Sequence, residues 1–263
     1  MTMLKLDEIV NNLKAKSEVD AVFLTGSQGS EHKSYSDIDL VVIFDKHKYD
    51  LTSLYTWTDD TFADIFFFDH ADLKRIEENQ QLPANAMDGV FVSWLEKASI
   101  LFDKSGKLTA LKNKKGDLIK KIEVPKSERD LFWQKINYNF VANRRYFESN
   151  DPLYHEALDI RLLYSVSEIL TGYFEFRNIP WRGEKTALKH LKQNDQDFHN
   201  AFVAYTKAAT LNERFDKYTS LAKLVFTSDY KFWNKGDVLP QSKDRTKVDT
   251  KKLAEYWQDL IRK

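Results

Sequence analysis

Apolar residues follow one spacing in the first part of the chain and another spacing in the rest. Up to about residue 104 they form short runs that end in polar turns, a pattern typical of β-strands. From Leu108 onward they recur every three or four residues, as on one face of an α-helix. The pattern therefore predicts an α+β front domain followed by an all-α helical bundle.

The individual elements follow from the same periodicities and from the polar turns between them. We expect strands over 21–25, 37–44, 62–68 and 99–103 and front helices over 4–16 and 69–79. Further helices are expected over 108–122, 127–148, 153–175, 184–193, 197–208, 212–227 and 249–262, with a polar loop over 235–248. Pro125 interrupts the helical pattern, so we expect domains of residues 1–122 and 123–263.

Composition excludes several classes of protein. An apolar fraction of 42% with 14% aromatic residues excludes a disordered or fibrous chain. The apolar runs are far shorter than the ~20 residues of a membrane span, and the N-terminus becomes charged too soon for a signal peptide, so we expect no membrane partner. The absence of cysteine excludes disulfides, thiolate zinc sites and cysteine nucleophiles, and it fits a cytoplasmic location.

Charge is balanced overall but unevenly distributed. The chain has 40 Lys and Arg against 40 Asp and Glu, which argues against a nucleic-acid partner, since such a protein needs a basic surplus. Residues 1–104 carry a net charge of −9 and residues 105–263 a net charge of +9. An acidic front half suits metal ions and a basic back half suits an anionic ligand, although drift of surface charge would give the same totals.

Two aspartates share one face of the expected strand 37–44. Asp37 and Asp39 are two residues apart, and alternate side chains of a strand project on the same side, roughly 6–7 Å apart along it. Two neighbouring carboxylates repel each other unless a cation lies between them. Mg²⁺ is the cation that these ligands favour, because it binds few carboxylates together with substrate phosphates.

A third acid fits the same site. Asp64 interrupts the apolar strand 62–68, where an unpaired charge would be costly. If this strand lies beside strand 37–44, Asp64 joins Asp37 and Asp39 around one or two cations. Asp69 is a rival for this position, but it lies at the end of the strand, where capping of the next helix is the simpler role.

Gly26 and Ser27 could bind the phosphates of a substrate. They directly follow the expected strand 21–25. Glycine allows a phosphate to approach the backbone N–H groups, and the serine hydroxyl can donate a hydrogen bond to a phosphate oxygen. Two metal ions beside such a turn form a recurrent arrangement for displacement at phosphorus.

The order of these residues resembles the nucleotidyltransferase superfamily, whose mark is a Gly-Ser turn, then Asp-x-Asp on the next strand, then a third Asp on a neighbouring strand. Within it, the chain is most similar to the bacterial aminoglycoside and lincosamide nucleotidyltransferases. That similarity rests on residues 62–73 (FADIFFFDHADL), on residues 99–106 (SILFDKSG) and on the helical second half.

The resemblance implies a mixed sheet that holds the three acids, two Mg²⁺ ions and ATP or another nucleoside triphosphate. A substrate hydroxyl attacks the α-phosphorus and pyrophosphate leaves. The helical domain of such enzymes usually supplies a carboxylate base. Helix 153–175 offers Asp159 first, Glu168 second and Glu156 third, although each could equally be a surface or salt-bridged residue. Lys185, near the start of helix 184–193, could contact the triphosphate.

The sequence therefore predicts a Mg²⁺-dependent enzyme, a monomer or homodimer, that transfers a nucleoside monophosphate, AMP from ATP, to a hydroxyl of a small molecule. An aminoglycoside antibiotic is the expected acceptor, and a lincosamide is the next. Two alternatives stay open at this point. One is nucleotidylation of a protein or nucleic acid, as by toxin-type relatives, and the other is a nucleotide-binding module without catalysis.

Overall fold

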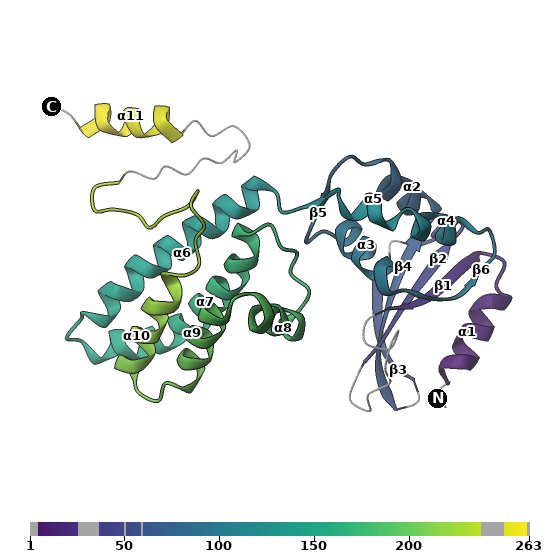
Figure 1. Ribbon diagram of the computed structural model, residues 1–263, viewed down its shortest axis with the longest axis horizontal. Coiled ribbons are helices and arrows are strands. Elements are labelled where there is room, and N and C mark those ends of the chain that lie inside the picture. The colour runs from purple at the N-terminus through teal and green to yellow at the C-terminus, as the bar shows by residue number, and fades with distance from the viewer. Residues whose placement is uncertain (1–4, 26–36, 50, 59, 238–249, 262–263) are drawn as a thin grey trace. The chain divides into compact units, whose positions relative to one another are not determined.

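The computed structural model describes residues 5–25, 37–49, 51–58, 60–237 and 250–261. Two compact units make up the chain, Met1–Glu123 (unit 1) and Val124–Lys263 (unit 2). Unit 1 combines a sheet with helices, and unit 2 is helical throughout its described elements (Figure 1). The α+β class expected from the apolar spacing is confirmed.

A five-stranded mixed sheet forms the centre of unit 1, in the order β3-β4-β2-β1-β6. The strands are β1 (Val19–Thr25), β2 (Ile38–Phe44), β3 (Ser53–Thr58), β4 (Thr61–Asp69) and β6 (Ser99–Asp103). The two strands that carry the candidate acids, β2 and β4, are parallel neighbours, and the other pairs are antiparallel. The expected adjacency of these two strands is therefore correct.

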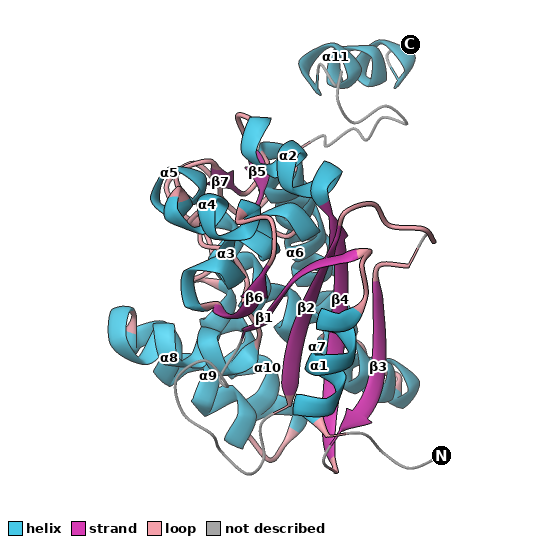
Figure 2. Ribbon diagram, turned by 90° about the vertical axis from the view of Figure 1, so that its right-hand side faces the viewer, coloured by secondary structure: helices cyan, strands magenta, loops and turns pink. Residues whose placement is uncertain are grey.

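Helices cover both faces of the sheet (Figure 2). One face packs against α1 (Leu6–Ala15) through Leu40 and Val42, and the other packs a second core through Val41 and Ile43. That second core is covered by α2 (His70–Glu78), α3 (Met87–Lys97), α4 (Lys107–Asn113) and α5 (Lys115–Ile119). Because both faces are buried, β2 reads as a continuous apolar run rather than an alternating one.

Three elements of unit 1 differ from the expectations. The expected helix 108–122 is replaced by α4, α5 and the short strand β7 (Ile122–Glu123), which pairs with β5 (Leu82–Pro83). The helical run is interrupted at Lys114, between α4 and α5, and it ends at Ile119. Helix α3 and strand β3 were not expected. Strand β3 is an edge strand with an exposed face, so it lacks the apolar run that marks the buried strands.

Unit 2 is built around one long helix. Its elements are α6 (Lys126–Phe147), α7 (Pro152–Phe176), α8 (Glu184–Asn194), α9 (Gln196–Lys207), α10 (Leu211–Ala222) and α11 (Thr250–Ile261). Helix α7 supplies much of the core, and Phe198 of α9 and Tyr218 of α10 are fully buried against it. Within the described ranges, no helix is both long and apolar enough to cross a membrane.

Helix α10 ends earlier than the expected span 212–227. The guanidinium of Arg177 donates hydrogen bonds to the carbonyls of Leu224 and Val225, at 3.2 and 2.9 Å. These two carbonyls lie beyond the C-cap residue of α10, Lys223. The segment that follows α10 is thus held by a residue that lies 47 positions or more earlier in the chain, a contact that periodicity cannot show.

Candidate active site

Three aspartates from two neighbouring strands meet at one end of the sheet. Asp39 of β2 is the direct partner of Asp64 of β4 in the parallel ladder, and Asp37 lies immediately before β2. One carboxylate oxygen from each residue lies within 4.8 Å of the others. Asp37 is exposed, and the other two side chains are partly buried. The strand register therefore brings together the three acids that the sequence singles out.

The electrostatics of this cluster favour a cation. Burial, together with the negative charge of Asp37, raises the pKa of Asp64. One oxygen of Asp64, Oδ1, is buried and has no hydrogen-bond partner among the described residues. A buried carboxylate oxygen without a partner is costly, and a divalent cation would satisfy it. The set of carboxylate oxygens is also the type of ligand that Mg²⁺ prefers, so the residues fit this metal.

The end of β1 lies next to the acids. Thr25, the last residue of β1, pairs with Asp39, and its buried hydroxyl has no hydrogen-bond partner among the described residues. Gly26 and Ser27 follow Thr25 directly in the chain but lie outside the described residues. The described part of β1 thus ends beside Asp39, and the phosphate-binding role of Gly26 and Ser27 stays a prediction.

Asp69 has a different role from the three acids. It lies five residues beyond Asp64 on β4 and caps helix α2, where its carboxylate accepts hydrogen bonds from the backbone N–H groups of Ala71 and Asp72, at 2.8 and 3.1 Å. It also accepts one from the backbone N–H of His47, at 3.1 Å. Burial alone would raise the pKa of Asp69, but these hydrogen bonds lower it. The capping role is therefore the one that its contacts support.

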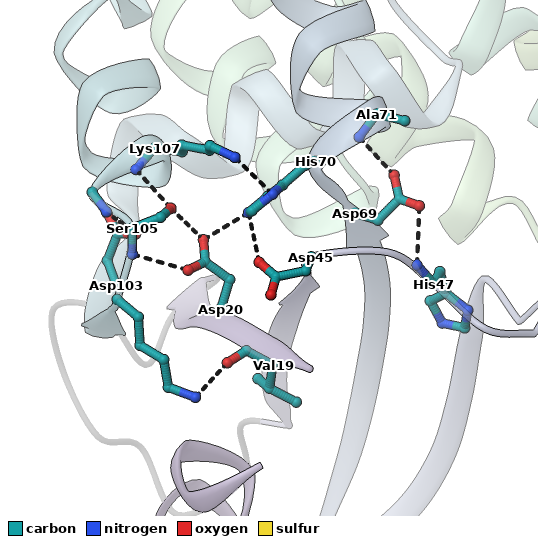
Figure 3. Close-up of polar contacts among 12 residues, drawn as sticks. Val19, Asp20, Asp45, His47, Asp69, His70, Ala71, Asp103, Ser105 and Lys107 are labelled. Atoms are coloured by element: carbon teal, nitrogen blue, oxygen red, sulfur yellow. Dashed lines mark hydrogen bonds and ion pairs between the residues drawn. The ribbon is translucent and has the colours of Figure 1, made fainter. Parts of the chain in front are cut away.

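A second acidic cluster, not expected from the sequence, lies at the opposite end of β1 (Figure 3). Asp20 is buried and accepts hydrogen bonds from the backbone N–H and the hydroxyl of Ser105, at 2.9 and 2.6 Å. Its other contact is the Nε2 atom of His70, at 2.8 Å. The only signal in the sequence was an acid within the apolar run of β1.

The contacts of Asp20 indicate a structural role for this residue. Lys107 Nζ lies 2.8 Å from Nδ1 of His70, which makes Nδ1 the acceptor and leaves Nε2–H to donate to Asp20. Burial by itself would raise the pKa of Asp20, but the hydrogen bonds from Ser105 and His70 lower it. The buried carboxylate is therefore already satisfied, and it links β1 to the turn after β6 and to the start of α2.

The candidate bases lie on helix α7, in different surroundings. Asp159 Oδ1 lies 2.9 Å from Nη2 of Arg214 on α10. The two groups form an ion pair, but their geometry does not meet the criteria of a hydrogen bond. Glu168 instead accepts a hydrogen bond of 2.5 Å from the amide of Asn139 on α6. Glu156 is exposed. The three carboxylates thus differ in their contacts: that of Glu168 meets a neutral amide, that of Asp159 a guanidinium, and Glu156 is exposed.

Glu168 belongs to a polar network between α6 and α7. Arg161 donates to the side-chain oxygens of Asn139 and Asn143, at 2.9 and 2.7 Å, and Asn143 donates to Ser165 at 3.0 Å. Asn139, Asn143 and Ser165 are buried. A satisfied buried network of this kind fixes side-chain positions, and it would therefore fix the orientation of the Glu168 carboxylate.

Lys185 is an exposed residue in the first turn of α8. Helix α8 begins after Gly183, whose φ of 79° lies in the region that favours glycine. Lys185 therefore lies at the start of a helix, as the sequence predicts. Its contact with a triphosphate stays a prediction.

Comparison with known proteins adds the family. A family model described as a nucleotidyltransferase domain matches residues 6–147, which include the strands of the acid cluster and extend to the end of α6. No curated protein matches the chain. Among solved structures, the chain is similar to a nucleotidyltransferase-like protein from Exiguobacterium sibiricum 255-15, at 15% identity and a TM-score of 0.44, over 83% of this chain and 72% of that one.

The family match covers more than half of the chain and includes the three clustered aspartates. The chain therefore belongs to the nucleotidyltransferase domain family and is a nucleotidyltransferase.

Proposed function

We propose that the enzyme transfers a nucleoside monophosphate, AMP from ATP, to a hydroxyl of a small molecule and releases pyrophosphate, in a reaction that depends on Mg²⁺. The observation that carries the proposal is the cluster of Asp37, Asp39 and Asp64, with its partnerless buried oxygen on Asp64. An aminoglycoside is the proposed acceptor and a lincosamide the next, so antibiotic resistance is part of the proposal.

The residues of the chain would divide the work. Asp37 and Asp39 would bridge two Mg²⁺ ions, and Asp64 would bind one of them. Bound Mg²⁺ supplies positive charge that stabilises the charge developing on the phosphate oxygens. Gly26 and Ser27 would bind the triphosphate. Lys185 would contribute a further positive charge to it.

The proton of the acceptor hydroxyl needs a base, and we assign it to unit 2. Glu168 takes the proton, with Asp159 as the alternative. The hydroxyl oxygen then forms a bond to the α-phosphorus, while the bond from the α-phosphorus to the oxygen that links it to the β-phosphate breaks. The electron pair of that bond leaves with pyrophosphate. Unit 1 is accordingly the proposed catalytic domain, and unit 2 is the proposed substrate-binding domain.

The test uses ATP labelled at the α-phosphate, Mg²⁺ and three groups of acceptors: aminoglycosides and lincosamides, tRNA, and lysate proteins. We expect label on a small molecule, and we expect Asp39→Asn to lower the rate about 100-fold or more. Asp45→Asn is the matched control, because Asp45 directly follows the same strand and is exposed but lies outside the cluster of Asp37, Asp39 and Asp64. Label on tRNA or protein alone would overturn the choice of acceptor.

A further inference from the structure

An exposed aromatic surface lies on the hairpin formed by β3 and β4, and we name it the aromatic hairpin surface. It consists of Tyr55, Trp57 and Phe62, which are 63%, 58% and 39% exposed. The rings of Tyr55 and Phe62 are stacked, with centroids 6.2 Å apart, and Trp57 meets Phe62 edge to face at 5.3 Å. Three large aromatic side chains that are exposed together are typical of a binding surface.

The register places this surface beside the acid cluster. Tyr55 is the direct partner of Asp64 in the antiparallel ladder, and Trp57 is the partner of Phe62. Partners in a ladder project on the same face of the sheet, about 5 Å apart. Phe62 is two residues before Asp64 on the same strand, so it also shares that face. The aromatic hairpin surface therefore continues the face that carries Asp64 and Asp39.

This step rests on the proposed function: the strand order indicates whether the nucleoside triphosphate or the acceptor lies next to the aromatic hairpin surface. Gly26 and Ser27, the proposed triphosphate ligands, follow β1, whereas the aromatic residues lie on β3 and β4, across β2. In a displacement at phosphorus, the attacking oxygen and the leaving group lie on opposite sides of the phosphorus atom. Pyrophosphate on the β1 side therefore leaves the β3 side to the acceptor.

The charge of the surroundings decides the chemistry of that acceptor. The aromatic faces attract cations, and Asp60, an acid outside the proposed metal site, lies in the turn of the same hairpin. Unit 1 has a net charge of −5. We propose that Tyr55, Trp57 and Phe62 form the acceptor subsite and that they bind a positively charged cyclic alcohol by stacking against its ring.

The test measures binding by isothermal titration calorimetry on the full chain. The variants are Trp57→Ala and Tyr55→Ala, and the control is Tyr49→Ala, whose ring is 70% exposed but lies outside the hairpin. Kanamycin and lincomycin are the cationic probes, trehalose is a neutral ring probe, and Mg²⁺-ATP and Mg²⁺-tripolyphosphate report on the phosphate site. Circular dichroism of each variant checks that the fold is retained.

We expect Trp57→Ala and Tyr55→Ala each to weaken binding of a cationic probe about tenfold and to leave Mg²⁺-ATP binding within about twofold. Tyr49→Ala should change neither, and trehalose should bind less tightly than the cationic probes to the wild type. These results would support the acceptor subsite.

Several outcomes would overturn the inference, and they differ from a failure of the proposed function. Unchanged probe binding in both hairpin variants, or no binding of any cationic probe to a wild type that binds Mg²⁺-ATP, would overturn the subsite alone. Weaker binding of Mg²⁺-ATP but not of Mg²⁺-tripolyphosphate would assign the surface to the nucleobase instead. A variant that only changes the oligomeric state would assign it to a contact between copies. Failure of the wild type to bind Mg²⁺-ATP would contradict the proposed function itself.

Discussion

Asp64 is the residue whose surroundings say most about the chemistry of the site. A buried carboxylate in a strand is costly unless a cation, a hydrogen-bond donor or a proton compensates its charge. Among the described residues, no donor contacts the Oδ1 atom of Asp64. The raised pKa of Asp64, caused by burial and by the charge of Asp37, shows the cost of its ionised form. A bound cation removes this cost, so stability and metal binding should be coupled at this residue.

The first prediction concerns Asp64→Asn. Without metal, the raised pKa means that wild-type stability falls as the pH rises through the pKa of Asp64 in the folded state, because the ionised form is penalised there. The variant should lack this loss and be at least as stable as the wild type at pH 7 without metal. Thermal unfolding with 10 mM Mg²⁺ and with EDTA checks this. Mg²⁺ should raise the unfolding temperature of the wild type but not that of the variant; an equal increase in both would contradict the assignment.

The second prediction concerns Asp20, the buried acid at the other end of β1. Asp20→Asn should lower the free energy of unfolding by about 1–3 kcal/mol at pH 7, because buried donors lose a charged acceptor. Since its pKa is lowered in the folded state, the stabilisation is present above the unfolded pKa and is lost as the pH falls through the folded one. Urea unfolding at pH 7 and at about pH 3 measures both effects.

The control for Asp20 is Asp117→Asn, which removes an exposed acid paired with Lys120 on the surface. It should change the unfolding midpoint very little, because exposed ion pairs are screened by water and salt. A wild-type advantage over Asp20→Asn that is as large at pH 3 as at pH 7 would show that the hydrogen bonds of Asp20 do not depend on its charge.

At the scale of elements, the contacts of α7 with α6 and α10 distinguish two carboxylates that look alike in sequence. Asp159 and Glu168 both interrupt the apolar pattern of α7. The difference comes from the partners on other helices, Arg214 for Asp159 and Asn139 for Glu168. Since those partners are 29 residues or more away in the chain, the sequence could not show that the two carboxylates have different contacts.

The third prediction follows from this difference. Glu168→Gln keeps the shape and the amide contact but removes the basic oxygen, so kcat should fall about 100-fold or more while the affinity for Mg²⁺-ATP is retained. Asp159→Asn breaks an ion pair that is partly exposed and should affect kcat much less. Steady-state kinetics with the best acceptor measures both. The opposite order of effects would restore Asp159 as the base.

The fourth prediction tests the packing of α3, a helix that the sequence did not reveal. A Cβ atom on Gly89 would lie 2.4 Å from the carbonyl oxygen of Pro83, so this helix can approach the backbone of β5 only with glycine here. Gly89→Ala should therefore lower the free energy of unfolding by about 1–3 kcal/mol.

The matched control is Gly116→Ala in α5. A Cβ atom there would meet nothing within 4 Å, and alanine is the better helix former, so this variant should gain about 0.5–1 kcal/mol. Chemical unfolding of both variants measures the difference. A Gly89→Ala protein as stable as the wild type would show that α3 can move away from β5 at little cost.

Across the whole molecule, sequence patterns located most of the strands and the three acids, but they missed strand β3 and helix α3. The runs of β1 and β2 are apolar because both faces of the sheet are covered there, which is why they could be predicted. Strand β3 exposes Tyr55 and Trp57, so burial did not mark it. Helix α3 contains Gly89. Glycine is a poor helix former, so its presence argues against a helix in the sequence, although the packing of α3 on β5 requires glycine at this position.

The net charges of the two parts of the chain also depend on where the boundary between them is drawn. The halves chosen from the sequence carry −9 and +9, but the two compact units carry −5 and +5, because the lysines of α4 and α5 belong to the unit that holds the acid cluster. The unit that carries the three aspartates is thus less acidic than the sequence division indicates. Recognition of a cation must come from local groups, as proposed for the aromatic hairpin surface.

The central claim is that Asp37, Asp39 and Asp64 together bind divalent cations for nucleotidyl transfer. The most direct measurement is a crystal soaked with Mn²⁺ and an ATP analogue that carries a methylene group between the α- and β-phosphorus atoms, with anomalous scattering recorded for manganese. The claim predicts an anomalous peak within about 2–2.3 Å of carboxylate oxygens from these three aspartates, with the phosphates of the analogue against it. Analogue bound without manganese at these carboxylates, or manganese bound only elsewhere, would contradict it.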